Sequence, residues 1–211
     1  IHLNFCQRRL GSVAVGFGAM IGGRVVKLML AAVASASASS VTLADINTNH
    51  DAETGCYHSD YDGQLVSASG YISAVLYNGF YMQDTPSGSL YGGMWVYAGS
   101  GSSLLDGLEI GMHVQVTGSV EEYYELTEIM VEADDPDDSV VIVDSTPATM
   151  VPYETTTGAI GEGCTADGES HEGLLVTVRN VQLLSEANNF GEITIDDGSG
   201  PTQLEDGLLN T

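Results

Sequence analysis

Basic residues are scarce in this sequence. Its 211 residues include 5 Lys and Arg against 29 Asp and Glu, which gives a formal net charge of -24. All 29 acids lie after residue 40. Arg179 is the only Lys or Arg in residues 41–211, so this part of the chain carries a net charge of -28. Nucleic-acid affinity comes mainly from Lys and Arg at phosphates. Direct tight binding of DNA or RNA is therefore not expected, and a nucleic-acid partner would need bridging cations.

Long apolar runs are missing as well. The apolar run Leu28–Val33 is far shorter than the roughly 20 residues that a membrane-spanning helix needs. It follows two basic residues and precedes the small residues Ala34–Ala38, which is the pattern of a secretory signal peptide. We predict that residues 1–40 are an upstream segment and a signal peptide starting at Met20, and that the rest is secreted, extracellular and free of membrane. A retained helical anchor is the alternative.

Cysteine is rare. Of 3 cysteines, Cys6 lies in the segment predicted to be removed, which leaves Cys56 and Cys164. Two cysteines in an exported chain indicate a disulfide bond. This bond would join the segment before the first strand-rich block to the start of the second block. Two separately buried thiols are the alternative.

Residue patterns that carry catalysis are also missing. The histidines after residue 40 are scattered without metal-ligand spacing, and no Ser or Cys lies in a recognisable nucleophile motif. These histidines are His50, His58, His113 and His171. The sequence predicts no catalytic residue, so whether the chain belongs to an enzyme stays open.

What the sequence does contain is a series of short strand-forming runs. Apolar alternation runs from Gln64 to Val75, and an Asn78-Gly79 turn follows it. Further runs lie at residues 80–84, 94–98, 114–120 and 126–131, separated by Gly, Ser, Asn and Pro clusters.

Five strands and a long insertion between the third and the fourth predict an all-β fold, an OB-like five-stranded Greek-key barrel. A sandwich would need about seven strands. We place this first OB-like barrel at residues 41–143. Val41–Ile46 would be an edge strand, Leu104-Leu105 one helical turn, and Val140–Val143 a sixth or linking strand.

The chain then repeats part of this pattern. Tyr61–Gly70 matches His171–Asn180, and each segment leads into a hairpin and an aromatic-led strand. We predict a linker at residues 144–170 and a truncated second OB-like barrel at residues 171–211, beginning with one long bent strand over His171–Leu184. Because a half barrel leaves an unpaired edge, we expect the natural protein to continue beyond this end.

Aromatic residues gather in the first three strands of the first block. On OB-type barrels an exposed face in this region stacks bases or sugars, and core packing is the alternative for part of the set. A neutral glycan suits this acidic chain better than bare nucleic acid. The binding-face candidates are Tyr71, Tyr81, Tyr91, Trp95 and Tyr97.

Acid clusters are candidates for binding Ca²⁺, which prefers oxygen ligands. The metal candidates are Asp196, Asp197, Glu205 and Asp206, and a second cluster comprises Asp134, Asp135, Asp137 and Asp138. Neither cluster has the spacing of an EF-hand loop, and acids are common in turns. We therefore expect a solvated acidic surface and no cofactor, with Ca²⁺ as the alternative.

Several segments carry a family resemblance: Gly70–Ala74, Gly79–Asp84, Met94–Tyr97, Ile110–Ile129, Glu172–Val178 and Phe190–Thr194. They resemble the OB-like region that precedes the nuclease domain in bacterial extracellular nucleases of the endonuclease/exonuclease/phosphatase type. The resemblance implies that the metal-binding acids and the catalytic His belong to a separate, later domain, onto which no residue here maps. Gly92-Gly93 stands where that family usually has an Asp.

Three functional hypotheses follow. The first is a secreted, non-catalytic OB-like binding or accessory module of a longer extracellular, nuclease-like protein. The second is a fragment of an extracellular metal-dependent nuclease whose catalytic domain lies beyond Thr211. The third is an acidic extracellular structural or adhesion module.

Overall fold

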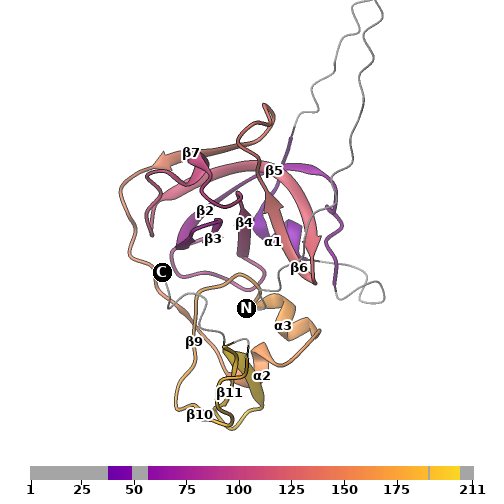
Figure 1. Ribbon diagram of the computed structural model, residues 1–211, viewed down its shortest axis with the longest axis vertical. Coiled ribbons are helices and arrows are strands. Elements are labelled where there is room, and N and C mark those ends of the chain that lie inside the picture. The colour runs from indigo at the N-terminus through magenta and orange to yellow at the C-terminus, as the bar shows by residue number, and fades with distance from the viewer. Residues whose placement is uncertain (1–37, 49–56, 190, 205–211) are drawn as a thin grey trace, which may run out of the picture.

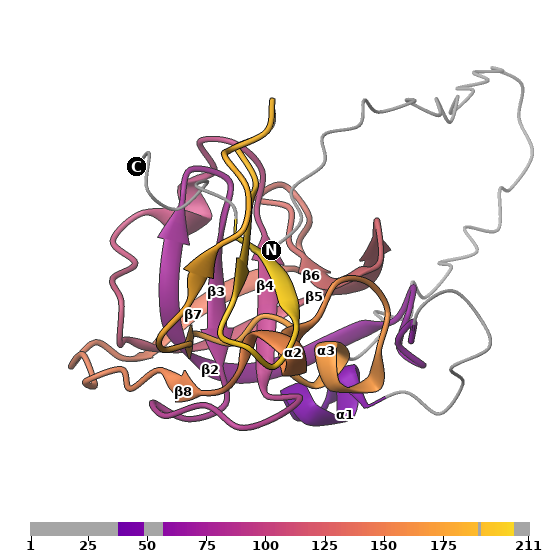
Figure 2. The same ribbon diagram turned by 90° about the horizontal axis from the view of Figure 1, so that it is seen from below.

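The computed structural model describes residues 38–48, 57–189 and 191–204. Residues 1–37 of the predicted upstream segment and signal peptide lie outside these ranges, as does Cys56, so both the signal peptide and the disulfide bond stay predictions. Figures 1 and 2 show a strand barrel, and the chain that follows it packs against one end. Within the described ranges, no helix is long and apolar enough to cross a membrane.

The barrel is closed by five strands. They are β2 (Leu65–Leu76), β3 (Gly79–Gln83), β4 (Gly93–Tyr97), β5 (His113–Tyr123) and β6 (Leu126–Met130). Their order is β2-β3-β4-β6-β5, and β5 returns to pair with β2. Only β4 and β6 run parallel within this ring. This confirms the predicted OB-like Greek-key barrel, including the helical turn η1 (Ser103–Leu105) between β4 and β5.

β2 makes the corner of the barrel. Its first half, Leu65–Tyr71, pairs with β5, and its second half pairs with β3. A bulge between Ile72 and Ala74 shifts the register, and such a bulge bends a strand. At Gly70, which precedes this bulge, an added Cβ would lie 3.0 Å from the carbonyl oxygen of Gln83. Glycine therefore allows β3 to approach β2 closely.

The barrel interior is filled by alternate residues of these strands, as period-2 patterning requires. The largest fully buried side chains in the barrel strands include Ile72, Phe80, Met82, Met94 and Ile129. Full burial of each such side chain stabilises the fold by about 1.5–3 kcal/mol.

The predicted edge strand at Val41–Ile46 is wrong. These residues lead into the helix α1 (Leu43–Asn47), because Thr42 and Asp45 form a capping box. The Thr42 Oγ1 accepts from the Asp45 amide at 3.0 Å, and the Asp45 carboxylate accepts from the Thr42 amide at 2.9 Å. Leu43 and Ile46 are buried in the core. The edge is instead formed by β1 (Ser39–Ser40), parallel to β2.

The chain after the barrel has more structure than a linker. Beyond the edge strand β7 (Ser139–Asp144) come β8 (Tyr153–Glu154), α2 (Thr157–Ile160), α3 (Ala166–Ser170), β9 (Val176–Thr177), β10 (Gln182–Leu183), β11 (Ile193–Asp196) and β12 (Pro201–Leu204). β8 pairs with β9, and β10, β11 and β12 form an open antiparallel sheet. β8, α2 and α3 all lie in the predicted linker, and the domain boundaries stay predictions.

The predicted long strand over His171–Leu184 is also wrong. It is replaced by β9 and β10, which belong to different sheets. Gly173 and Asn180 have positive φ values of 68° and 57°, and such values interrupt extended backbone. The strand predicted after this segment agrees with β11.

This later segment is fastened to the barrel by hydrogen bonds. The amide of Leu175 donates to the side-chain oxygen of the buried Gln83 at 3.2 Å. The amide of Thr127 donates to the Glu172 carboxylate at 2.9 Å, and the Tyr91 amide donates to the Ser170 carbonyl at 2.7 Å. The barrel and residues 170–175 therefore form one packed unit.

Candidate functional site

Tyr81 and Trp95 lie side by side on the outer face of the barrel. They are directly opposed on β3 and β4, with ring centroids 4.6 Å apart. Their exposed fractions are only 5% and 3%, because Leu76 and the partly buried Leu126 pack with them. For these two residues the packing alternative holds, and neither ring is open to stack a ligand in this structure.

The other predicted aromatic residues lie in separate places. Tyr71 on β2 stacks on His113 of β5, with ring centroids 4.6 Å apart. Tyr91 adopts a φ of 64°, and its carbonyl accepts from the buried Asn47 side chain at 3.0 Å. Tyr97 borders the outer cluster of Tyr81 and Trp95. The five candidates therefore do not form one continuous binding face.

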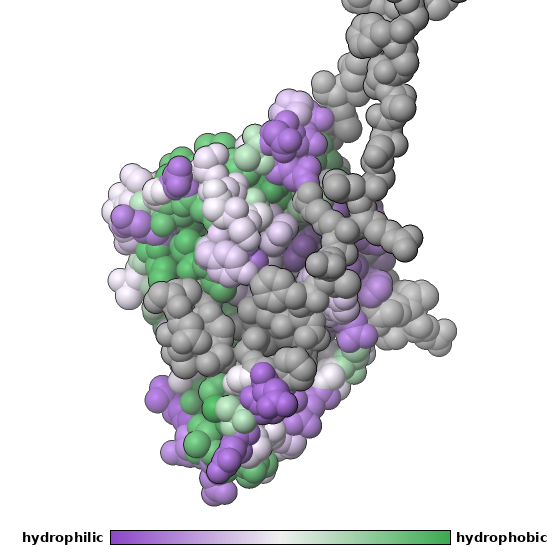
Figure 3. All heavy atoms as spheres, in the orientation of Figure 1, coloured by the Kyte–Doolittle hydropathy of each residue, from purple (hydrophilic) through white to green (hydrophobic). Residues whose placement is uncertain are grey.

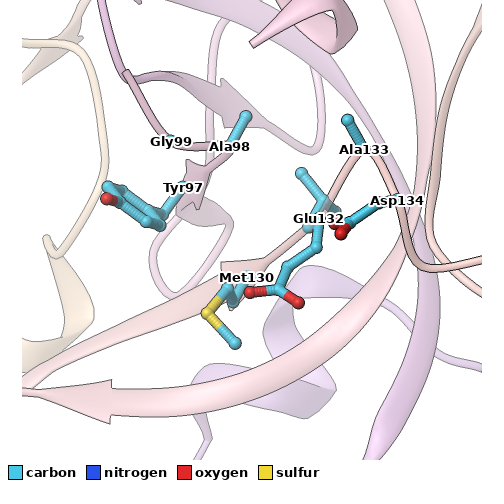
Figure 4. Close-up of a pocket in the computed structure, with 8 residues that line it drawn as sticks. Tyr97, Ala98, Gly99, Met130, Glu132, Ala133 and Asp134 are labelled. Atoms are coloured by element: carbon cyan, nitrogen blue, oxygen red, sulfur yellow. The ribbon is translucent and has the colours of Figure 1, made fainter. Parts of the chain in front are cut away.

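A surface pocket of about 260 Å³ opens where β4 and β6 end. Its lining comprises Tyr97, Ala98, Gly99 and the segment Met130–Asp134. Figure 4 draws the Tyr97 ring on one side of this group and the Glu132 and Asp134 side chains on the other. The pocket thus combines an aromatic residue with two carboxylates that accept hydrogen bonds.

Backbone hydrogen bonds fix the chain segments around this pocket. The Val131 amide donates to the Tyr97 carbonyl at 2.9 Å, which ties the end of β6 to the end of β4. The Ala98 amide donates to the Asn78 carbonyl at 2.9 Å and joins the pocket to the turn between β2 and β3. This turn corresponds to one of the loops with which OB-type barrels bind ligands.

The turn between β5 and β6 is strained. Tyr124 and Glu125 have φ values of 51° and 66°, a conformation that favours Asn-Gly. The rings of Tyr123 and Tyr124 meet edge to face at 4.8 Å, and Tyr124 is 54% exposed. Strained backbone is concentrated at functional positions, which makes this turn a second, smaller candidate.

Carboxylates gather on β6 and beside it. Glu128 is 5% exposed and opposes Glu121 across the hairpin. Burial, followed by the charges of Glu121 and Glu122, raises the pKa of Glu128 to about 7. Burial and the charge of Glu169 raise the pKa of Glu172 well above its ordinary value. Glu172 is partly exposed as a residue, but its carboxyl group is enclosed by protein.

The metal candidates are engaged in local hydrogen bonds. Asp196 Oδ1 accepts from the amides of Gly198 and Gly200 at 2.6 and 3.1 Å. Asp197 accepts from the Thr157 hydroxyl at 2.9 Å and from the Ser199 amide at 3.0 Å. Glu205 and Asp206 lie outside the described residues. Among the residues that are described, no group of three or more His, Cys, Asp and Glu is arranged to hold a metal ion.

The second acid cluster is similarly engaged. Asp135 Oδ1 accepts from the Asp137 amide at 2.9 Å, and Asp138 Oδ2 accepts from the Glu132 amide at 2.8 Å. These carboxylates therefore close the turns that lead into β7.

Replacement of Asp197 tests whether its role is structural. Hydrogen bonds from the Ser199 side chain and amide lower the pKa of Asp197 to about 2, because they favour the ionised form. We expect Asp197→Ala to lower the melting temperature equally in Ca²⁺ and in EDTA, since it releases Thr157 and Ser199. Differential scanning fluorimetry would measure this, with Asp196→Ala as the neighbouring comparison. A loss confined to Ca²⁺-containing buffer would contradict the structural role.

The sequence did not identify two features of this region as candidates: the buried carboxylate of Glu128 and the strained turn at Tyr124-Glu125. Alternation along β6 places Glu128 on the face opposite the core residue Ile129, where a solvated carboxylate is the ordinary expectation. Tyr124-Glu125 lacks the Asn or Gly that marks a tight turn. The one available signal was the density of acids at residues 121–128.

Comparisons with known proteins give little further information. The sequence matches no family model and no curated protein. The structure is similar to that of the hypothetical protein ygiW from E. coli, with 17% identity, 39% of this chain and 77% of that chain covered, and a TM-score of 0.27. A similarity at this level carries no functional argument.

Proposed function

We propose that this chain is a secreted, non-catalytic OB-like binding module of a longer extracellular protein. Its ligand would be a neutral oligosaccharide, which the pocket of Tyr97, Glu132 and Asp134 would receive. The observation that carries this proposal is the position of the pocket, beside the β2–β3 turn of an OB-like barrel.

The chemistry of the lining supports a sugar. A sugar ring offers an apolar face that packs against an aromatic side chain, and hydroxyl groups that donate to carboxylates. A phosphate or a nucleic-acid backbone would instead meet Glu132 and Asp134 in a chain of net charge -24. A neutral ligand avoids this repulsion.

Replacement of Tyr97 tests the pocket. We expect isothermal titration of the chain with a panel of neutral oligosaccharides to show binding by at least one of them. Tyr97→Ala should weaken that binding at least about tenfold, the loss expected for one aromatic contact of about 1.4 kcal/mol.

Tyr153→Ala is the matched control, because Tyr153 is a partly exposed tyrosine of β8 that does not line the pocket. It should leave the affinity unchanged. Equal losses in both variants, or no binding by any oligosaccharide of the panel, would contradict the proposal.

A further inference from the structure

The strand β7 has an open outer edge. It is the last strand in the order of the seven-stranded sheet, and its inner edge pairs with β5 from Thr117↔Ser139 to His113↔Asp144. In the parts of the chain that the structure describes, no strand pairs with the other edge. Such an edge presents backbone N–H and C=O groups to which another strand can be added.

This edge is apolar and exposed on both faces. Val141, Ile142 and Val143 are 51%, 41% and 55% exposed. Alternation directs Val141 and Ile142 to opposite faces, and a register shift leaves Val143 between the paired residues Ile142 and Asp144. Green, hydrophobic atoms lie along the upper margin of the barrel in Figure 3, where Figure 1 draws β7. Proteins usually protect an edge strand with Lys or Pro, and residues 139–143 contain neither.

The surroundings of β7 are acidic at both ends. Asp135 and Asp137 are exposed before the strand, and Asp144 is exposed at its end. The sole base of the described residues, Arg179, lies 2.6 Å from Glu154 in an ion pair. Within this part of the chain no Lys or Arg is therefore left to balance the negative charge beside β7, where His113 is paired with Asp144 across the strands.

The negative charge beside β7 distinguishes two possible binding partners for this edge, a second copy of the chain and a basic strand of another protein. A second copy of the chain would place its own acids against these acids, and like charges across paired strands are destabilising. A strand with Lys or Arg among its apolar residues would gain both the backbone ladder and complementary charge.

We propose that the outer edge of β7 binds an extended segment of a basic partner protein. The segment adds a strand to the sheet, its apolar residues cover Val141 and Val143, and its basic residues face Asp137 and Asp144. This surface is distinct from the lining of the oligosaccharide pocket, so the two proposals can fail independently.

A peptide experiment tests the proposal on the whole chain. The probe is a fluorescent heptapeptide of alternating Lys and Val, and fluorescence anisotropy follows its binding. We expect saturable binding that weakens as salt is added. A peptide of the same length with a central Pro should not bind at the same concentrations, because Pro cannot extend a strand ladder.

Substitutions locate the binding edge. The double variant Val141→Thr and Val143→Thr keeps β-branched residues and removes apolar surface, so the affinity should fall about tenfold with an unchanged melting temperature. Leu183→Thr with Leu184→Thr is the matched control, since these leucines are 70% and 55% exposed at the other sheet. This control should bind the peptide as the parent chain does.

Three outcomes would overturn the proposal. Equal binding of the Pro-containing peptide would show that the acids attract any polycation. An equal loss in the leucine control would place the binding elsewhere. Sedimentation that shows a dimer of the chain, abolished by the two valine substitutions, would identify a second copy as the occupant.

Discussion

Glu128→Gln is expected to stabilise the chain at pH 8 by on the order of 3 kcal/mol and to leave its stability at pH 4 nearly unchanged. The pKa of Glu128 rises from an ordinary 4.5 to about 7, first because of burial and then because of Glu121 and Glu122. Raising a pKa by one favours the protonated form over the charged form by about 1.4 kcal/mol. A neutral Gln removes the cost of a buried negative charge.

The direction in which stability changes with pH follows from the number of protons that the folded and the unfolded chain bind. Between pH 4.5 and about 7 the folded chain holds a proton on Glu128 that the unfolded chain has released, so stability falls as the pH rises through this window. The raised pKa of Glu172 acts in the same direction. Urea unfolding at pH 4, 6 and 8 would measure the free energy of unfolding of the parent chain and the variant.

Glu125→Gln is the matched control for this prediction. Glu125 lies on the same hairpin, is exposed, and carries the same charge. If both variants gained equally at pH 8, general repulsion within an acidic chain would account for the effect, and the burial of Glu128 would not.

The sequence predicts the barrel well because the residue patterns that indicate its strands and turns are local in the chain. Period-2 alternation and the Asn78-Gly79 turn indicate the strands that the structure shows as β2 to β6. The count of five strands indicates an OB-like barrel, and the closure of β5 onto β2 follows from that type. The edge strand at Val41–Ile46 failed because the capping residues Thr42 and Asp45 outweigh a short apolar run.

The candidate site is less predictable because it depends on long-range packing. Alternation places Tyr81 and Trp95 on the outer face, but only the structure shows that Leu76 and Leu126 cover them. Tyr97 and Asp134 were sequence candidates for two different sites, an aromatic face and an acid cluster. They reach one pocket, together with Glu132, only through the parallel pairing of β4 with β6. The pKa of Glu128 likewise depends on its depth in the fold.

The packing of residues 172–175 on the barrel is a feature that the repeat in the sequence does not reveal. Gly93 of β4 lies against the backbone of this segment, and an added Cβ would meet Glu172, Gly173 and Leu174. These are backbone atoms and cannot turn aside, as a side chain could. The substitution must therefore move either β4 or the segment.

We expect Gly93→Ala to release the segment and to leave the barrel closed. β4 is held by β3 and β6 on its two edges and by the buried Met94 and Val96, whereas the segment is held by a few hydrogen bonds. Overpacking of this kind costs about 1–3 kcal/mol. The amides of Thr127 and Leu175, which donate to Glu172 and Gln83, should exchange hydrogen about tenfold to a hundredfold faster.

Gly92→Ala is the matched control, because the three atoms nearest to the added Cβ at that position all belong to the side chain of Asp84 and none to the backbone of residues 172–175. In this control the Thr127 and Leu175 amides should keep their protection in hydrogen exchange followed by mass spectrometry. The amides of Phe80 and Val96 report on the barrel itself in both variants. If their exchange rose as much as that of Leu175, the barrel and the segment would unfold together, and the expectation of local release would be wrong.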